Sequence, residues 1–181
     1  NTQLRAAFVG EVHIGDTICT RENPKALPRI TVDEPTVSMK FGINNSPFAG
    51  KEGKIIQSTK IRERLLKETL RNVALQVEDT DDANVFLVKG RGEFQMVILI
   101  ETLRREGFEL TVGRPQVIYK EVNGKRLEPV EHLFVDCDEA FVGIVTEKLS
   151  ARKGRMVNLV NHGTGRVRME FSIPSRGLIG Y

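Results

Sequence analysis

The feature that most constrains this chain is a repeated switch between two spacings of apolar residues, with a breaker residue near each switch. Apolar and polar side chains alternate from Thr36 to Ile43, which is the period of a half-buried strand. A loop with Gly, Pro and Ser follows, and apolar residues then recur at helical spacing. The switching continues to about Val112 in the order β-α-β-β-α-β. This order predicts an α+β, ferredoxin-like domain with a four-stranded sheet under two helices.

The elements of this first unit can be bounded by their patterns. The expected strands are Thr36–Ile43, Val73–Val77, Val85–Val88 and Phe108–Val112. We expect the first helix to be capped by Ser58 or Thr59 and to bury Ile61, Leu65, Leu66 and Leu70. The second helix should begin near Glu93, end before Gly107 and bury Met96, Val97, Ile100 and Leu103.

A second unit of the same kind begins near Arg114-Pro115. Asn123-Gly124 is a strong signal for a hairpin turn. The expected elements then are a strand Val130–Cys137, a helix capped by Asp138 that buries Phe141, Ile144, Val145 and Leu149, and strands Met156–Val160 and Val167–Ile173. A complete unit needs another helix and strand, so we expect residues 114–181 to form a truncated ferredoxin-like domain.

Residues 1–32 have a different pattern of short β segments and turns, such as Thr17–Thr20 after Gly15-Asp16. About thirty residues of this kind cannot bury a core of their own. We therefore expect them to be the end of a β domain and the chain to be a piece of a longer protein.

Charge and cysteine content exclude several classes of protein. The net charge of +3 is mild and permits a polyanionic partner without requiring one. Uncharged stretches such as Ala140–Thr146 are far shorter than a membrane span of about 20 residues. Cys19 and Cys137 lie far apart and lack Cys or His at metal-binding spacing. A secreted disulfide scaffold, a zinc knuckle and a membrane protein are therefore not expected, and the chain should be cytoplasmic.

The motifs of catalysis are absent from the sequence. A phosphate-binding loop of the form Gly-x-x-x-x-Gly-Lys-Ser/Thr does not occur, and Gly50–Lys54 has the wrong spacing. Gly90–Glu93 precedes a helix and suits either an anion site or a tight turn. The three histidines, His13, His132 and His162, are scattered and suggest no nucleophile triad. We expect no catalytic, cofactor-binding or metal-binding residue in this chain.

Two groups of basic residues are the remaining candidates for a functional surface. Lys51 and Lys54 lie in the first long loop, and Arg152, Lys153 and Arg155 surround the end of the third predicted helix. Clustered Lys and Arg neutralise phosphates without reading bases. A solvated basic face is an equally good interpretation of the same residues.

Long segments of the sequence resemble the BipA/TypA family of ribosome-associated translational GTPases. The resemblance rests on Val32–Met39, Asn45–Lys54, Asn72–Leu75, Gly90–Glu93, Arg104–Leu110, Gly113–Pro115 and Ile173–Gly180, and it runs almost from end to end. It implies that residues 1–32 end the β-barrel domain II, that 33–113 are similar to domain III of elongation factor G, and that 114–181 are similar to most of its domain V.

The resemblance also implies a role. Members of the family hydrolyse GTP with Mg and act on the ribosome in its assembly, in translation regulation and in the stress response. The GTPase domain and the distinctive C-terminal domain of the family are missing here, so no catalytic residue carries over. No large domain IV lies between the two units, which argues against a translocase. The implied partners are the ribosome, through its RNA and proteins, and the protein's own GTPase domain, with no membrane or DNA.

Under this interpretation Lys51, Lys54, Arg152, Lys153 and Arg155 are candidate ribosomal RNA contacts. The location would be the cytoplasm, or the plastid stroma if the protein is from a plant. A different class of function stays open, because paired ferredoxin-like units often bind metabolites between them. The alternative is therefore a small-molecule-binding regulatory module.

Overall fold

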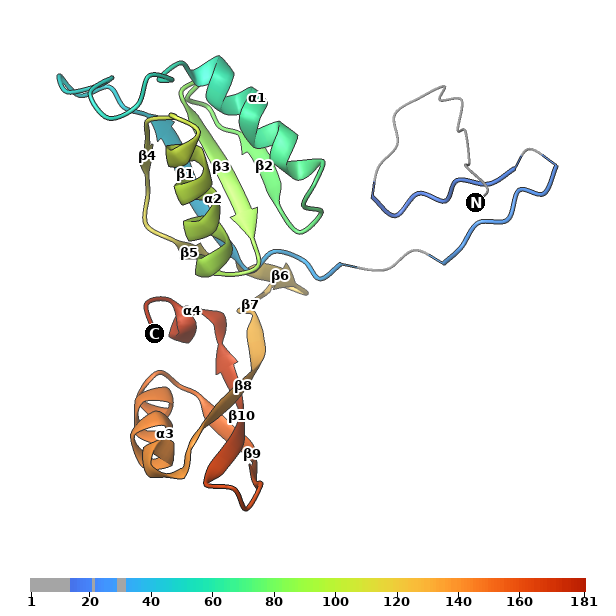
Figure 1. Ribbon diagram of the computed structural model, residues 1–181, viewed down its shortest axis with the longest axis vertical. Helices are drawn as coiled ribbons and strands as arrows, with labels where there is room; N and C mark the ends of the chain where they lie inside the picture. Colours follow the sequence, from blue (N-terminus) through green and yellow to red (C-terminus); the bar gives the residue numbers. More distant parts are fainter. Residues whose placement is uncertain (1–13, 21, 29–31) are drawn as a thin grey trace.

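The computed structural model describes residues 14–20, 22–28 and 32–181. Two α/β units follow one another along the long axis of the molecule, with the first unit above the second in Figure 1. The first is built from β1 (Val37–Ile43), α1 (Ser58–Thr69), β2 (Gln76–Asp79), β3 (Val85–Gly90), α2 (Glu93–Arg105) and β4 (Leu110–Val112). The order β-α-β-β-α-β is the one the sequence predicts, and the ferredoxin-like α+β class is confirmed.

The sheet of the first unit has β1 and β3 at its centre, in the order β2-β3-β1-β4. All of its strand pairs are antiparallel. Both helices cover one face of this sheet (Figure 1), and a single apolar cluster fills the space between them. Its fully buried members include Phe41 from β1, Ile61 and Leu65 from α1, and Met96 and Leu103 from α2.

The chain between the two units adds a strand that sequence analysis did not predict. Strand β5 (Gln116–Val117) pairs with Ser38 and Val37 of β1, beyond the end of β4. The amide of Ile118 then donates to the carbonyl of Thr36 at 2.9 Å. The first unit therefore holds the connection as far as Ile118, whereas the expected boundary lay at Gly113-Arg114. Strand β5 has only two residues, which is too short for an alternation of apolar and polar side chains to be recognised. It is therefore identified only by its pairing with β1.

The second unit begins with a hairpin of β6 (Lys120–Val122) and β7 (Lys125–Leu127). Its turn residues, Asn123 and Gly124, both have positive φ, as a two-residue hairpin of this type requires. The remaining elements are β8 (Val130–Asp138), the short 3-10 helix η1 (Glu139–Phe141), α3 (Val142–Ala151), β9 (Arg155–Asn161), β10 (Arg166–Pro174) and α4 (Ser175–Leu178). Strands β8, β9 and β10 form one antiparallel sheet in the order β8-β10-β9.

The core of the second unit lies between α3 and this three-stranded sheet. Val167, Met169, Phe171 and Ile173 alternate along β10 and are buried against Leu149 of α3. The inward residues of β8 are only half-buried. In the part of the chain that the structure describes, β8 pairs with β10 alone.

Several helix positions differ from the expected ones. Gln57, rather than Ser58 or Thr59, is the N-cap residue of α1, and no side chain caps it. On α2 the buried stripe is Met96, Leu99 and Leu103, while Val97 is 50% exposed. One position along a helix is a rotation of about 100°, so Val97 falls outside the stripe that Met96 begins.

The other differences lie at the ends of elements. Leu70 follows the last residue of α1 and is exposed. Phe141 and Ile144 are exposed as well, because a 3-10 turn precedes α3 and rotates Val142 and Val145 toward the core. The expected second strand starts only at Gln76, because the side chain of Asn72 accepts the amide of Ala74 in a tight turn.

The N-terminal β segments are not found as strands where the structure describes them. Thr17–Thr20 has no assigned strand, and residues 22–28 contain turns and irregular backbone. An extended segment becomes a strand only when its backbone groups pair with another strand. Residues 1–13, 21 and 29–31, which complete the expected β-barrel remnant, lie outside the described part.

A first prediction concerns the core around Phe41, which lies in the central strand and is fully buried. Phe41→Ala should lower the free energy of unfolding by about 3–5 kcal/mol, because it removes buried apolar area and leaves a cavity. Phe94→Ala is the matched control, since Phe94 is 81% exposed and should change stability by less than about 0.5 kcal/mol. Denaturant unfolding measures both, and equal losses would contradict the assigned core.

Candidate functional site

The described residues contain neither a group of three His, Cys, Asp or Glu side chains able to hold a metal ion nor a helix long and apolar enough to span a membrane. Cys19 and Cys137 are free thiols. The basic residues singled out from the sequence lie in the β1–α1 connection and around the α3–β9 turn.

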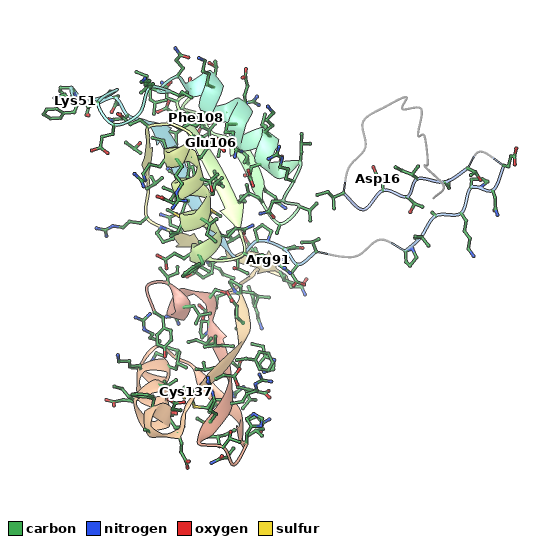
Figure 2. All side chains as sticks on the ribbon, viewed as in Figure 1. Asp16, Lys51, Arg91, Glu106, Phe108 and Cys137 are labelled. Carbon is green, nitrogen blue, oxygen red and sulfur yellow. The ribbon has the colours of Figure 1, made fainter. Side chains whose placement is uncertain are left out.

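Lys51 and Lys54 lie in a long connection between β1 and α1, residues 44–57. Much of this loop is wound into tight turns. The amide of Ser46 donates to the side chain of Asn44, and the amide of Phe48 donates to the hydroxyl of Ser46. Two backbone turns follow, from Ala49 to Ser46 and from Lys51 to Phe48. The loop projects away from the sheet and helices, and Lys51 lies at its far end (Figure 2).

One carboxylate holds this loop in place. Glu109, just before β4, accepts the amides of Gly50, Glu52 and Gly53 at 2.9–3.1 Å, and it accepts the side-chain amide of Asn44 at 2.6 Å. Four donors from one loop therefore converge on a single side chain that lies 56 or more residues away in sequence. Backbone amides arranged around an anion form the same kind of nest that binds phosphates in other proteins.

The base of the loop is fixed by backbone contacts on both sides of Glu109. Ile55 and Phe108 form a parallel bridge, in which Ile55 donates to Gly107 and Glu109 donates to Ile55. Gly53 is buried there, and a Cβ at this position would lie 2.7 Å from the Cβ of Glu109. A side chain at residue 53 would therefore push the loop away from its carboxylate.

The exposed end of the loop combines an aromatic ring with positive charge. Phe48 is 65% exposed, and the ammonium group of Lys51 lies 4.6 Å from the centre of its ring. Lys54 is exposed as well. We call residues 46–54 the Phe48 loop. Its contacts suit a cation–aromatic surface that meets a polyanion.

The second basic group lies in the tight turn between α3 and β9. Lys153 has a φ of 71°, and the amides of Lys153 and Gly154 donate back to Ser150 and Leu149. Arg155 begins β9 and is exposed. This group belongs to the other unit, so the structure does not bring the two basic groups together into one site (Figure 1).

Arg152 has different contacts from the ones that an RNA-binding residue needs. Its guanidinium donates to the carbonyls of Gly177, Ile179 and Gly180 at 2.9–3.0 Å. It also lies over the ring of Tyr181. A Cβ at Gly177 would be 2.6 Å from the carbonyl oxygen of Arg152, so the segment approaches α3 closely. Arg152 therefore holds residues 177–181 against the end of α3.

Another arginine of the second unit, Arg168 on β10, is paired with an acid. Arg168 makes a two-pronged ion pair with Asp136 across β10 and β8, at 2.9 Å for each bond. The hydrogen bonds and the charge of Arg168 lower the pKa of Asp136. The positive charge of Arg168 is therefore largely offset by the negative charge of Asp136.

The arrangement of two α/β units can now be compared with known proteins. The protein named Large ribosomal subunit assembly factor BipA from Salmonella typhimurium is 53% identical over 173 residues, which cover 96% of this chain and 28% of that protein. The proteins of the same name from Haemophilus influenzae and Synechocystis sp. are also 53% identical, over 96% and 97% of this chain and 28% and 29% of their own lengths. The chain belongs to the BipA/TypA family.

Two further comparisons concern the domains. The family described as Elongation factor G C-terminus matches residues 125–181 of this BipA/TypA segment. A solved structure from Thermus thermophilus aligns with 90% of this chain and 40% of its own, at 14% identity and a TM-score of 0.49. The chain spans less than a third of the length of the curated BipA relatives named above.

Sequence reasoning missed the two residues that organise these surfaces of the BipA/TypA segment. Glu109 was assigned no role, and Phe48 was part of a long loop without a function of its own. A signal for Glu109 does exist, because a loop with several glycines leaves amide donors that need an acceptor. The sequence does not show which distant carboxylate supplies it.

A second prediction concerns the acid–base behaviour of Glu109. Hydrogen bonds from the amides of Gly53 and Gly50 lower its pKa from 4.5 to about 2. Because the pKa is lowered on folding, the carboxylate stabilises the loop above about pH 4.5 and loses this effect as pH falls toward 2. NMR should find that the amide signals of Gly50 and Gly53 are unchanged between about pH 5 and 3. Movement of these signals with a midpoint near 4.5 would contradict the arrangement.

A third prediction concerns Arg152. Arg152→Ala should lower the free energy of unfolding by about 1–2 kcal/mol, because three carbonyls lose a charged donor. It should also speed hydrogen exchange at the amides of Gly180 and Tyr181. Arg155→Ala removes the same charge from an exposed position and is the control. Similar exchange rates in the two variants would contradict the role of Arg152 in holding residues 177–181 against α3.

Proposed function

We propose that this chain is the ribosome-binding, conformation-transmitting part of a BipA/TypA-type translational GTPase. The observation that carries the proposal is 53% identity over 96% of the chain to proteins named as large ribosomal subunit assembly factors. The intact protein would hydrolyse GTP with Mg in a domain outside this sequence. It would act in the cytoplasm, in ribosome assembly, translation regulation and the stress response. We assign no hydrolysis to the chain itself.

We propose the following correspondence with elongation factor G. Residues 1–32 would end the β-barrel domain II, 33–113 would be the domain III-like unit, and 114–181 would be an incomplete domain V-like unit. The order of elements in both sheets supports the last two assignments. The pairing of β5 with β1 supports a joint between the units after Ile118.

Transmission between the units would use the contacts at this joint. The amide of Gly180 donates to the carboxylate of Glu93, at the start of α2, at 2.7 Å. Arg91 and Lys120 form ion pairs with Asp33 and Glu34, which precede β1. A movement of the GTPase domain that changed the residues before β1 would therefore act directly on the joint.

Binding to ribosomal RNA would use phosphate neutralisation by the exposed cations of both units. Lys51 and Lys54 would contact phosphates from the first unit, and Lys153 and Arg155 from the second. Arg152 would contribute through the segment that it holds. Because these contacts neutralise charge without reading bases, they would provide affinity and orientation rather than sequence specificity.

The alternative function, a small-molecule-binding module, is supported by a cavity of about 410 Å³ between the start of α2 and residues 175–181. Its volume is in the range of ligand sites. Glu93 and Glu131 line it, and the carboxylate of Glu93 already accepts the amide of Gly180. Arg91 is the cation of the lining and is already paired with Asp33. Two carboxylates beside one paired arginine disfavour nucleotides and other anions, and the ribosome remains the better supported partner.

A fourth prediction tests the role of the α3–β9 turn. The double variant Lys153→Ala/Arg155→Ala should weaken co-sedimentation with purified ribosomes and lower the slope of log affinity against log salt by about 1.4–1.8, or about 0.7–0.9 for each lost phosphate contact. Arg104→Ala/Arg105→Ala is the matched control. It removes the same charge from α2, where both arginines bind Glu101. Equal effects of the two double variants would refute a specific contact at the turn.

A further inference from the structure

The Phe48 loop has an unusual combination of exposure and order. Its tip carries a largely exposed aromatic ring, while hydrogen bonds to Glu109 and local turns hold its backbone. Ordering backbone costs about 1–2 kcal/mol per residue in conformational entropy. The ring of Phe48 is not among the residues of the apolar core. The loop is therefore ordered although its aromatic side chain lies outside the apolar core and is largely exposed, which is typical of a preformed binding loop.

The tip of the loop carries more positive than negative charge, since residues 46–54 contain Lys51, Lys54 and one acid, Glu52. Glu109 faces the backbone amides, and Glu52 is exposed beside Lys51. The ammonium group of Lys51 lies over the ring of Phe48, and Lys54 is exposed. The described tip thus presents two cations and one acid beside an aromatic ring, which leaves it with a net positive charge.

The shape of the loop selects between partners. It projects from the unit within the β1–α1 connection and has Lys51 at its extremity (Figure 2). A projecting tip offers no groove, pocket or sheet edge of the kind with which proteins recognise a peptide. An exposed aromatic ring beside a cation is suited to an unpaired base and its phosphate, since every base offers a flat face for stacking.

We propose that the Phe48 loop is a preformed RNA-stacking tip, in which Phe48 stacks on an unpaired base, Lys51 contacts the adjoining phosphate and Glu109 is the positioning residue. This inference rests on the proposed function and names the chemistry of one of its contacts. Glu109 touches no RNA in this arrangement. It acts by holding the backbone on which the ring and the ammonium group are carried.

The first test measures binding of the 181-residue chain to purified large ribosomal subunits. Phe48→Ala should weaken binding about ten-fold, which corresponds to the loss of one stacked base. Phe48→Tyr should retain binding, whereas Phe48→Leu should not, because only the tyrosine restores an aromatic face. Phe94→Ala, which removes an exposed ring from α2, should leave affinity unchanged. Equal effects of Phe48→Leu and Phe48→Tyr would overturn the stacking role.

The second test asks whether removing the negative charge of Glu109 strengthens or weakens binding. Glu109→Gln removes a negative charge, which by simple electrostatics should strengthen binding to a polyanion. The positioning role predicts the opposite, a loss of about five-fold or more. Glu63→Gln, which removes the same charge from an exposed position on α1, should not weaken binding. Stronger binding of Glu109→Gln would overturn the role of Glu109.

A double-mutant cycle separates positioning from a general loss of fold. If Glu109 acts through the tip, Phe48→Ala should cost much less in the Glu109→Gln background than alone. Additive losses would contradict the coupling. Thermal unfolding of Phe48→Ala should match the unsubstituted chain, so this variant stays informative even if Glu109→Gln is poorly folded.

The third test identifies the partner. Phe48→p-benzoylphenylalanine keeps an aromatic side chain and forms covalent adducts on irradiation. An adduct with ribosomal RNA supports the proposal, whereas an adduct with ribosomal protein alone, or none, overturns it. Failure of the unsubstituted chain to bind the subunits would instead overturn the proposed function. If Phe48→Ala binds normally while Lys153→Ala/Arg155→Ala binds weakly, the stacking role of the Phe48 loop is refuted and the proposed function is not.

Discussion

Pairing along both edges of β1 is the interaction on which the rest of the first unit depends. This strand pairs with β3 on one side and with β4 and β5 on the other, while Val37, Met39 and Phe41 are buried beneath. The same seven residues therefore fix the sheet, the helix-facing core and the connection to the second unit. The loop that follows β1 therefore begins at the end of a strand that is paired on both sides, and Glu109 fixes the rest of it.

Two charged side chains fix the position of segments that lie mostly outside the helices and strands. Glu109 gathers backbone amides of the Phe48 loop, and Arg152 gathers carbonyls of residues 177–181. The chemistry is complementary, because a carboxylate only accepts hydrogen bonds and a guanidinium only donates them. In each case one charged side chain, distant in sequence, forms the hydrogen bonds that these backbone groups would make in a helix or a sheet. The two segments differ in exposure, because the tip of the Phe48 loop is exposed whereas residues 177–179 are buried or half-buried against the end of α3.

The sequence was most informative where a period could be counted. Alternation along Val37–Ile43 and along Arg166–Pro174 identified two strands and their buried faces, and Asn123-Gly124 identified a hairpin. It was least informative about which helix face is buried, since Val97, Phe141 and Ile144 were assigned to the core and are exposed. A shift of one residue rotates a helix face by about 100°, and the start of α3 depends on a 3-10 turn that leaves no periodic signal.

The sequence by itself determined the order of elements, the α+β class and the family, because these follow from periodicity and from long stretches of identical residues. Tertiary structure alone decided what the charged residues do. Arg152 and Arg168 are basic in sequence but are engaged by carbonyls and by Asp136, while Lys51 stays exposed over Phe48. The physical reason is that a charge is neutralised by whatever lies within a few ångströms. Glu109 and the Phe48 loop come within that distance only when β4 forms beside β1.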